Sequence, residues 1–160
     1  MRILATFILS ASLVSTGASA FDSEHLKQLK ETNACSKCDL SDADLSNLDL
    51  AKAKINRTNL SGANLSGANL MFANLVGSRF IGANMTEINL SAANASGANL
   101  KGANLTDAKL IRARLRGANF AETDLTGANM KGANLSDISQ DKAIFCNTIM
   151  SDGRVERSGC

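Results

Sequence analysis

Residues 61–70, Ser-Gly-Ala-Asn-Leu-Ser-Gly-Ala-Asn-Leu, contain the same five-residue unit twice without a gap. A five-residue step matches neither the period of an α-helix, about 3.6 residues, nor that of a β-strand, about 2 residues. Apolar residues at this spacing would spread around a helix and could not be buried together. The unit therefore predicts one side of a structure that turns at every repeat.

The same step continues in one phase far beyond this stretch. Every fifth residue from Leu40 to Leu135 is apolar, and we call these the central residues. The residue two places before each central residue is mostly Ala, as in Ala63 and Ala68, and we call this the small position. The exceptions at the small position are mainly Leu48, Thr58, Ser78, Ile88, Thr123 and Ile138. Both sets are expected to line one dry core.

Glycine indicates where the chain turns. Nine of the twelve glycines fall two residues after a central residue, as Gly67 does in Leu65-Ser66-Gly67-Ala68. A type II turn requires a positive φ at that place, which glycine adopts without steric cost. Where the same place holds another residue, we expect a type I or irregular turn. These exceptions include Asp42, Asn47, Asp107 and Asp137.

Asparagine precedes the central residue in most repeats, for example at Asn59, Asn64 and Asn69. Short amides stacked between coils can bond to neighbouring backbone or to each other. We therefore interpret these residues as a structural ladder rather than as a binding site.

The Ala-(Asn/Asp)-Leu-x-x pattern, as in Ala63-Asn64-Leu65-Ser66-Gly67, resembles the pentapeptide-repeat proteins over residues 38–138. About twenty such units in unbroken phase make the resemblance specific. It implies an all-β solenoid: a right-handed quadrilateral β-helix with four repeats per coil and about five coils. Coils stacked about 4.8 Å apart would give a rod on the order of 25 Å long with a filled interior.

The first twenty residues have the features of a secretory signal peptide. Arg2 is followed by an apolar run over residues 3–14 and by Ala18-Ser19-Ala20, a small-x-small cleavage pattern. The run is shorter than the roughly 20 apolar residues that a membrane-spanning helix needs. Residues 1–20 are therefore expected to be removed before Phe21, and the protein to be periplasmic or secreted.

An open coil exposes its core and its unpaired edge, so both ends of the rod need caps. Residues 21–37 predict an N-terminal cap. Within it residues 22–33 form a helix that Asp22 or Ser23 begins and Asn33 ends. Phe21, Leu26 and Leu29 are expected to lie over the coil of residues 40–55. Residues 139–160 form the C-terminal cap, where Asp152-Gly153 predicts a hairpin with a two-residue turn.

The chain has four cysteines, and four thiols allow three pairings. A rigid rod would hold the first two far from the last two, beyond the reach of a disulfide. We therefore predict two structural disulfides, Cys35–Cys38 and Cys146–Cys160. A thioredoxin-like redox site would need a βαβ context, and a zinc site would need four convergent ligands. His25 is the single histidine, so no metal site is expected.

The charge of the chain bears on its partners. It carries 17 basic and 15 acidic residues, and removal of Arg2 with the signal peptide leaves it near neutral. Family members that protect DNA gyrase are thought to mimic B-DNA with a strongly acidic surface, and this chain departs from that pattern. One basic cluster at outward positions could meet an anionic lipid, glycan or nucleic acid, or could be a solvated corner. It consists of Lys109, Arg112, Arg114 and Arg116.

Large apolar residues also occupy outward turn positions where other repeats mostly carry polar residues. Such groups on a solenoid can mark a surface for a protein partner or for self-association, although single surface apolar residues are also ordinary. The candidates are Met71, Phe72, Val76 and Ile81 on consecutive sides of about one coil, with Ile111 stacked two coils beyond Met71.

The sequence shows no catalytic constellation and no phosphate-binding glycine loop, because its glycines serve turns. No enzyme activity and no cofactor are expected. The function predicted is that of a non-catalytic exported scaffold or protein-binding module. The alternative, a DNA mimic that interacts with gyrase, is disfavoured by the near-neutral charge and the predicted export.

Overall fold

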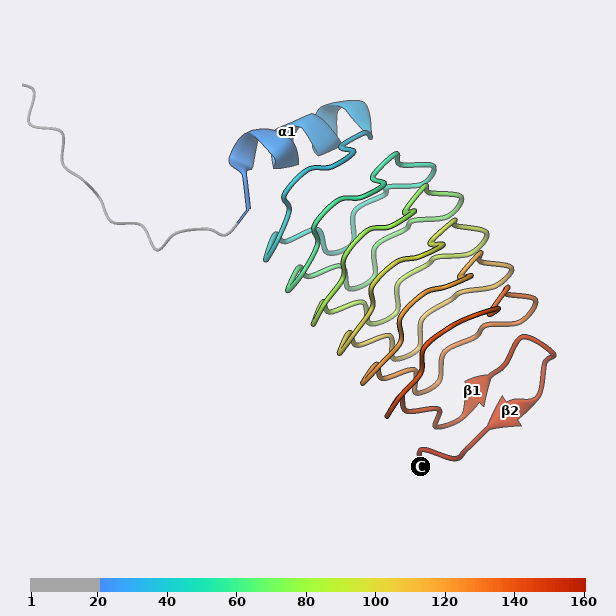
Figure 1. Cartoon of the computed structure of the whole chain (residues 1–160). Coiled ribbons are helices and arrows are strands. Elements are labelled where there is room, and N and C mark those ends of the chain that lie inside the picture. The colour runs from blue at the N-terminus through green and yellow to red at the C-terminus, as the bar shows by residue number, and fades with distance from the viewer. Residues whose placement is uncertain (1–20) are drawn as a thin grey trace, which may run out of the picture.

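The computed structural model describes residues 21–160; the predicted signal peptide lies outside them. Helix α1 (Ser23–Thr32) lies at one end of a stack of square coils (Figure 1). The two short strands β1 (Thr148–Ile149) and β2 (Val155–Glu156) form a hairpin at the other end. Within the described part of the chain, no helix is both long and apolar enough to cross a membrane.

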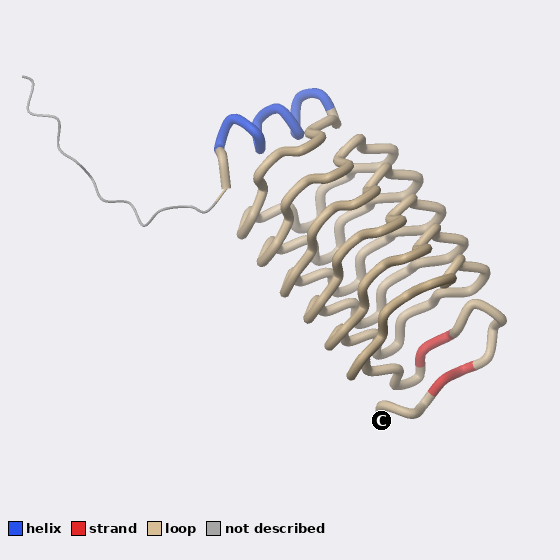
Figure 2. Tube along the Cα trace, viewed as in Figure 1, coloured by secondary structure: helices blue, strands red, loops and turns tan. Residues whose placement is uncertain are grey.

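Parallel β-bridges join each side of a coil to the side twenty residues later, from Ala34↔Lys54 to Asn129↔Ile149. The bridges form four columns, and the column through Asn64, Asn84 and Asn104 is one of them. The stacking thus extends beyond both ends of the predicted repeat region of residues 38–138. Figure 2 shows the body of the rod as turns and loops, because each side contributes a single bridging residue.

Backbone hydrogen bonds between coils use three of the five N–H groups of a typical repeat. The Leu65 N–H donates to the Asn84 carbonyl (2.7 Å), and the Asn84 N–H donates back to the Ala63 carbonyl (3.0 Å). The Gly67 N–H donates to the Thr86 carbonyl (2.9 Å) of the next coil. The Ala68 N–H closes its own turn on the Leu65 carbonyl (3.1 Å). The coil therefore satisfies its buried backbone without long strands.

The interior holds the two sets of residues that the five-residue pattern predicts. Leu65, Met85 and Leu105 are fully buried, as are most of the alanines at the small position. Towards the ends, Leu48 and Leu135 are only partly buried. The prediction of one dry axis is confirmed.

Hydroxyl groups replace alanine at four small positions and are fully buried there. Each donates to the carbonyl 23 residues earlier. The pairs are Thr58 to Cys35 (2.6 Å), Ser78 to Ile55 (2.7 Å), Thr123 to Leu100 (2.8 Å) and Thr148 to Leu125 (2.7 Å). Burial of these hydroxyls is therefore compensated by a hydrogen bond in every case.

The third residue of every turn is left-handed, whether or not it is glycine. Gly67 has φ 65°, and Asp42, Asn47, Asp107 and Asp137 have φ between 56° and 59°. The expectation of type I or irregular turns at those four positions is wrong. A left-handed residue other than glycine costs roughly 1–2 kcal/mol. The coil imposes this conformation because the N–H of the same residue must donate to the next coil, as the Asp42 N–H does to Ser61 (2.9 Å).

The asparagines form the predicted structural ladder. The Asn59 Oδ1 accepts the Ser61 hydroxyl (2.8 Å), while the Asn59 amide donates to the Asp39 carboxylate of the preceding coil (3.0 Å). The same step joins Asn64 to Asp44 (3.2 Å) and Asn69 to Asp49 (2.9 Å). The first coil thus carries aspartate on three of its sides.

Helix α1 begins where the sequence predicts. Asp22 is the N-cap and accepts the Glu24 N–H (2.9 Å), and Asn33 ends the helix in the left-handed conformation (φ 54°). Leu29 is fully buried, and Phe21 and Leu26 pack against the same core. The helix therefore covers part of the open end of the first coil.

The C-terminal hairpin differs from the predicted one in register. Thr148 pairs with Glu156 and Ile149 with Val155. The Met150 N–H donates to the Arg154 carbonyl (2.8 Å), which leaves three residues in the turn instead of the predicted two. Gly153 adopts φ 87° at the last of them, a pattern that ordinarily includes a bulge. The predicted two-residue turn is therefore wrong.

Both disulfides are present in the predicted pairing. Cys35 and Cys38 are 5.4 Å apart between Cα atoms, and Cys146 and Cys160 are 4.7 Å apart. The first closes the turn beneath α1, and the second ties the chain end to the start of the hairpin.

Ala95 is the one small central residue, and it is buried together with Met85 and Ile88. Residues ten apart lie on opposite sides of a twenty-residue coil, so Met85 faces Ala95 across the tube. We expect Ala95→Leu to lower the free energy of unfolding by about 1–3 kcal/mol through overpacking. Adding Met85→Ala should restore part of the loss. Urea unfolding measures both, and a clearly more stable Ala95→Leu would contradict this packing.

The Cys146–Cys160 disulfide should protect the hairpin locally. Closing a loop of about 15 residues contributes up to about 3 kcal/mol. In a Cys146→Ser, Cys160→Ser variant, amide exchange at Met150 should therefore accelerate by up to about a hundredfold, while exchange at Leu65 stays unchanged. The control is Cys35→Ser with Cys38→Ser, which should leave Met150 unaffected. Equal protection of Met150 in all three proteins would show that the disulfide does not hold the hairpin.

Candidate partner-binding surface

A groove of about 650 Å³ runs along one corner of the rod. Turn residues of successive coils line it, each pair twenty residues after the last. They are Met71 and Phe72, Ser91 and Ala92, Ile111 and Arg112, Lys131 and Gly132, and finally Ser151. We call this the corner groove.

Side-chain size produces the groove. Large residues project at Met71 and Phe72 and again at Ile111 and Arg112, and the coil between them carries only Ser91 and Ala92. Phe72 is 57% exposed and stands in the left-handed turn position, with φ 59°. It adds no core packing and bears the steric cost that glycine avoids at this place in other coils. The exposure of this aromatic ring makes Phe72 a candidate for contact with a partner.

The cationic half of the corner groove is the part nearer the C-terminus, which contains Arg112 and Lys131. A Cβ on Gly132 would lie 3.3 Å from the Arg112 Cγ, so the Arg112 side chain lies over Gly132 of the next coil. Lys109 and Arg114 flank Arg112 on the two adjoining sides and are exposed. No ion pair involves any of these four cations within residues 21–160.

The corner also lacks acidic residues over four coils. Residues 69–74, 89–94, 109–114 and 129–134 contain no Asp or Glu. Two cations on other corners are paired by contrast, with Lys101 3.3 Å from Glu122 and Arg116 3.2 Å from Asp137. Lys109, Arg112, Arg114 and Lys131 therefore form one group of cations beside the apolar half of the groove, with no acidic residue among them.

The structure brings together residues that the sequence assigned to two separate candidate surfaces. Met71, Phe72 and Ile111 share the corner groove with Arg112. Val76 and Ile81 lie half-buried at other corners, and Arg116 lies on the corner of Val76, where it pairs with Asp137. Sequence reasoning missed Lys131, although the twenty-residue stacking of Lys131 on Ile111 could have revealed it.

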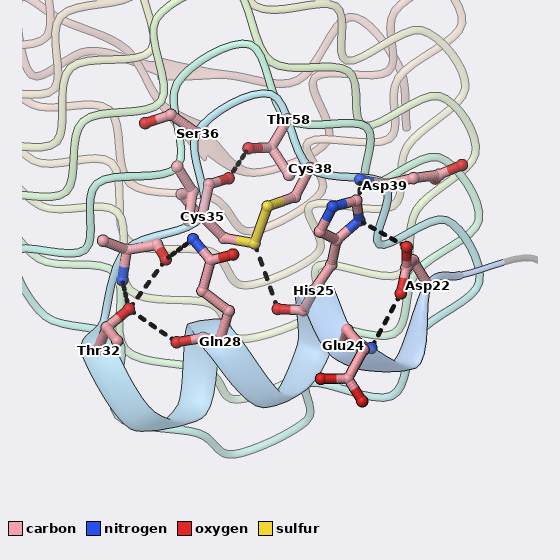
Figure 3. Close-up of a disulfide and its surroundings, with 12 residues drawn as sticks. Asp22, Glu24, His25, Gln28, Thr32, Cys35, Ser36, Cys38, Asp39 and Thr58 are labelled. Carbon is pink, nitrogen blue, oxygen red and sulfur yellow. Dashed lines mark hydrogen bonds and ion pairs between the residues drawn. A yellow bond between two sulfur atoms is a disulfide. The ribbon is translucent and has the colours of Figure 1, made fainter.

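The N-terminal end of the rod contains the cysteine pair and the single histidine (Figure 3). His25 Nδ1 accepts the Asp39 N–H (3.2 Å) and lies 3.6 Å from the Asp22 carboxylate. The Cys35 sulfur lies 3.2 Å from the His25 carbonyl oxygen; this is a contact and not a hydrogen bond, since a disulfide sulfur carries no proton. These contacts fasten α1 to the first coil. No group of potential ligands in residues 21–160 could hold a metal ion.

Asp39 and Asp44 of the first coil are stabilised as carboxylates. Hydrogen bonds from the Ser41 hydroxyl (2.7 Å) and the Ser41 N–H (3.1 Å) lower the pKa of Asp39. The Ser46 hydroxyl and N–H likewise lower the pKa of Asp44. Because Asp44 is exposed and Asp39 is half-buried at the surface, with no cleft around either, these shifts fit a structural role and not acid–base chemistry.

A comparison with known families matches the sequence pattern described as pentapeptide repeats, in eight copies, over residues 35–70, 73–110 and 98–137. The chain belongs to the pentapeptide-repeat family. Its fold is therefore that family's right-handed β-helix solenoid. No curated protein matches the chain.

Solved structures of pentapeptide-repeat proteins resemble the rod. Rfr23 from the cyanobacterium Cyanothece 51142 has a TM-score of 0.73 at 29% identity, covering 79% of this chain and 97% of that one. A protein from the Arabidopsis thaliana thylakoid lumen has a TM-score of 0.58 at 34% identity, covering 59% of this chain and 66% of that one. QnrB1, a plasmid-mediated fluoroquinolone resistance protein, has a TM-score of only 0.30 at 20% identity. This similarity is too weak to indicate a binding partner for the present chain.

Asp39→Asn tests the role of the first-coil carboxylates. Asn can accept the same bonds, as Asn59 does from Ser61, so unfolding at pH 7 should be unchanged. A lowered pKa in the folded state contributes stability above the ordinary pKa and loses it as the pH falls through the lowered value. Between about pH 5 and pH 2, the wild type should therefore lose more free energy of unfolding than Asp39→Asn.

Urea unfolding of the wild type and Asp39→Asn across that pH range measures the two free energies of unfolding. The control is Asp141→Asn, because the Asp141 carboxylate accepts no hydrogen bond from the described residues. An acid sensitivity of Asp39→Asn equal to that of the wild type would contradict the assignment.

Proposed function

We propose that the chain is an exported, non-catalytic binding module that presents the corner groove to a protein partner. The observation that carries this proposal is the corner groove itself, with an exposed Phe72 beside unpaired cations. The core supports the same view, since the central side chains and alanines fill the axis of the rod. Ligand recognition on a solenoid of this kind falls to its outward residues.

Export is part of the proposal. The signal-like pattern of residues 1–20 supports it, and so do two disulfides, since disulfides persist in oxidising compartments. One similar structure is that of a thylakoid-lumen protein. Intact-mass measurement of the protein recovered from the periplasm or medium would show a chain that begins at Phe21 and lacks free thiols.

A binding module fits the surface better than a DNA mimic does. A mimic of B-DNA needs a continuous acidic face, and between residues 70 and 135 this rod has only four acidic residues. They are Glu87, Asp107, Glu122 and Asp124, and one of them is paired with Lys101. We therefore expect the protein to have no effect on DNA supercoiling by gyrase.

The double variant Met71→Ser, Phe72→Ser tests the groove as a partner surface. The protein is immobilised and exposed to periplasmic extract or medium of the producing cell, and the captured proteins are quantified by mass spectrometry. We expect at least one protein to be captured by the wild type and reduced about tenfold or more by the double variant, because its apolar contact is lost.

The matched control is Val76→Ser with Ile81→Ser, which removes the two candidate apolar residues that lie outside the groove. This control should capture the same proteins as the wild type. Identical capture by both double variants, together with unchanged sedimentation, would count against the proposal.

A further inference from the structure

We propose that the corner groove binds an acidic amphipathic segment of a partner protein. Its apolar side chains would occupy the hollow over Ser91 and Ala92, and its carboxylates would meet Arg112 and Lys131. This inference rests on the proposed function and adds the chemistry of the partner.

The apolar half of the groove has the size of a side-chain site. Phe72 and Arg112 occupy the same turn position two coils apart, a separation of about 10 Å at the usual spacing between coils. Ala92 stands between them and leaves a hollow with Phe72 on one side and Ile111 and Arg112 on the other. A leucine or phenylalanine side chain fits such a hollow, and burial of Phe72 against it is favourable.

The cationic half determines the sign of the ligand. Four cations lie on this corner and its two adjoining sides: Lys109, Arg112, Arg114 and Lys131. None of them has an acidic partner within the described chain, in contrast to Lys101 and Arg116. Charge complementarity with a carboxylate-rich segment would neutralise this excess and speed its association.

The length of the groove sets the length of the segment. Four coil steps separate Met71 from Ser151, which is about 19 Å at the usual spacing. About 13 residues of helix or about 6 residues of extended chain span this distance. A segment that carries apolar residues at one end and acidic residues at the other matches the order of the groove.

Other occupants match fewer of these features. A second copy docked corner to corner would bring the same cations together. A nucleic acid would leave the apolar half unmatched, since Phe72 is the single aromatic residue available for stacking on this corner. An anionic membrane would interact with the cations but would not require the hollow between Phe72 and Arg112.

The test uses the purified protein and three fluorescein-labelled peptides of about 12 residues, followed by fluorescence anisotropy. The first peptide carries Leu and Phe in its first half and Glu in its second half. The second has Gln in place of every Glu, and the third has Ser in place of every Leu and Phe. We expect the first peptide to bind at least about tenfold more tightly than either control, and to weaken with added salt.

Two variants locate the binding. Phe72→Asn and Arg112→Asn keep a residue that tolerates the left-handed turn, as Asn47 does at φ 56°. Each should weaken binding of the first peptide about tenfold. The control for Arg112 is Arg57→Asn, which changes an exposed arginine at the same turn position (φ 57°) on another corner. The control for Phe72 is Ile81→Ser. Both controls should bind within about twofold of the wild type.

Several outcomes would overturn the inference. Equal binding of the Glu and Gln peptides would show that the groove does not require carboxylates in its ligand. Equal binding by the Phe72→Asn variant and the wild type would show that the peptide does not bind in the corner groove. Arg112-dependent binding to phosphatidylglycerol vesicles without peptide discrimination would assign the corner to lipid, and Phe72-dependent self-association in sedimentation would assign it to a second copy.

The proposed function has its own readout. One outcome is that the first peptide shows no binding while the Met71→Ser, Phe72→Ser protein still captures less of a partner than the wild type does. That result would contradict the acidic segment as the ligand and would leave the proposed binding module intact. If the capture experiment also shows no difference, both proposals fail.

Discussion

The backbone hydrogen bonds between neighbouring coils are the interaction on which the rest of the rod depends. The N–H of every central residue from Leu40 to Met130, as at Leu65, donates to a carbonyl nineteen residues later, and this fixes the coil length. A coil of fixed length places every central side chain on the axis and every turn at a corner. Gly67 and Phe72 share a backbone conformation for this reason, although their side chains have opposite preferences.

A filled axis confines chemistry to the outside of the molecule. Four hydroxyls enter the core, and each donates to a backbone carbonyl, as Thr123 does to Leu100. Neither these hydroxyls nor the buried central residues provide a binding or catalytic site inside the rod. Stacking then turns distant sequence positions into one surface. Phe72 and Arg112 are forty residues apart in the chain, and they line the same groove.

The sequence predicted the features that the five-residue period controls and missed those that depend on exact geometry. The buried column through Leu65 and Met85, the helix that Asp22 begins, and both disulfides were predictable because composition and spacing determine them. The left-handed turn at Asp42 was not, since local propensity favours a different turn and the inter-coil bond overrides it. The hairpin register also escaped prediction, because Asp152-Gly153 suits turns of two or three residues alike.

The grouping of the candidate surface residues was only partly predictable. Spacing by twenty relates Met71 to Ile111 once four repeats per coil are assumed. Whether Arg112 is free or paired depends on the acids of adjoining coils, and the structure was needed to separate it from Arg116. Lys131 lay outside both clusters in the sequence, because it belongs to a later coil.

Aspartate on three sides of the first coil gives the asparagine ladder a direction. Four of the asparagines, Asn59, Asn64, Asn69 and Asn84, donate their NH₂ group back to the preceding coil. An asparagine at one of these first-coil positions would leave that donor without a preceding coil to receive it. Carboxylates at Asp39, Asp44 and Asp49 have no hydrogen to donate, so the first coil offers no such donor on these three sides. The three aspartates thus end the side-chain ladder at the first coil.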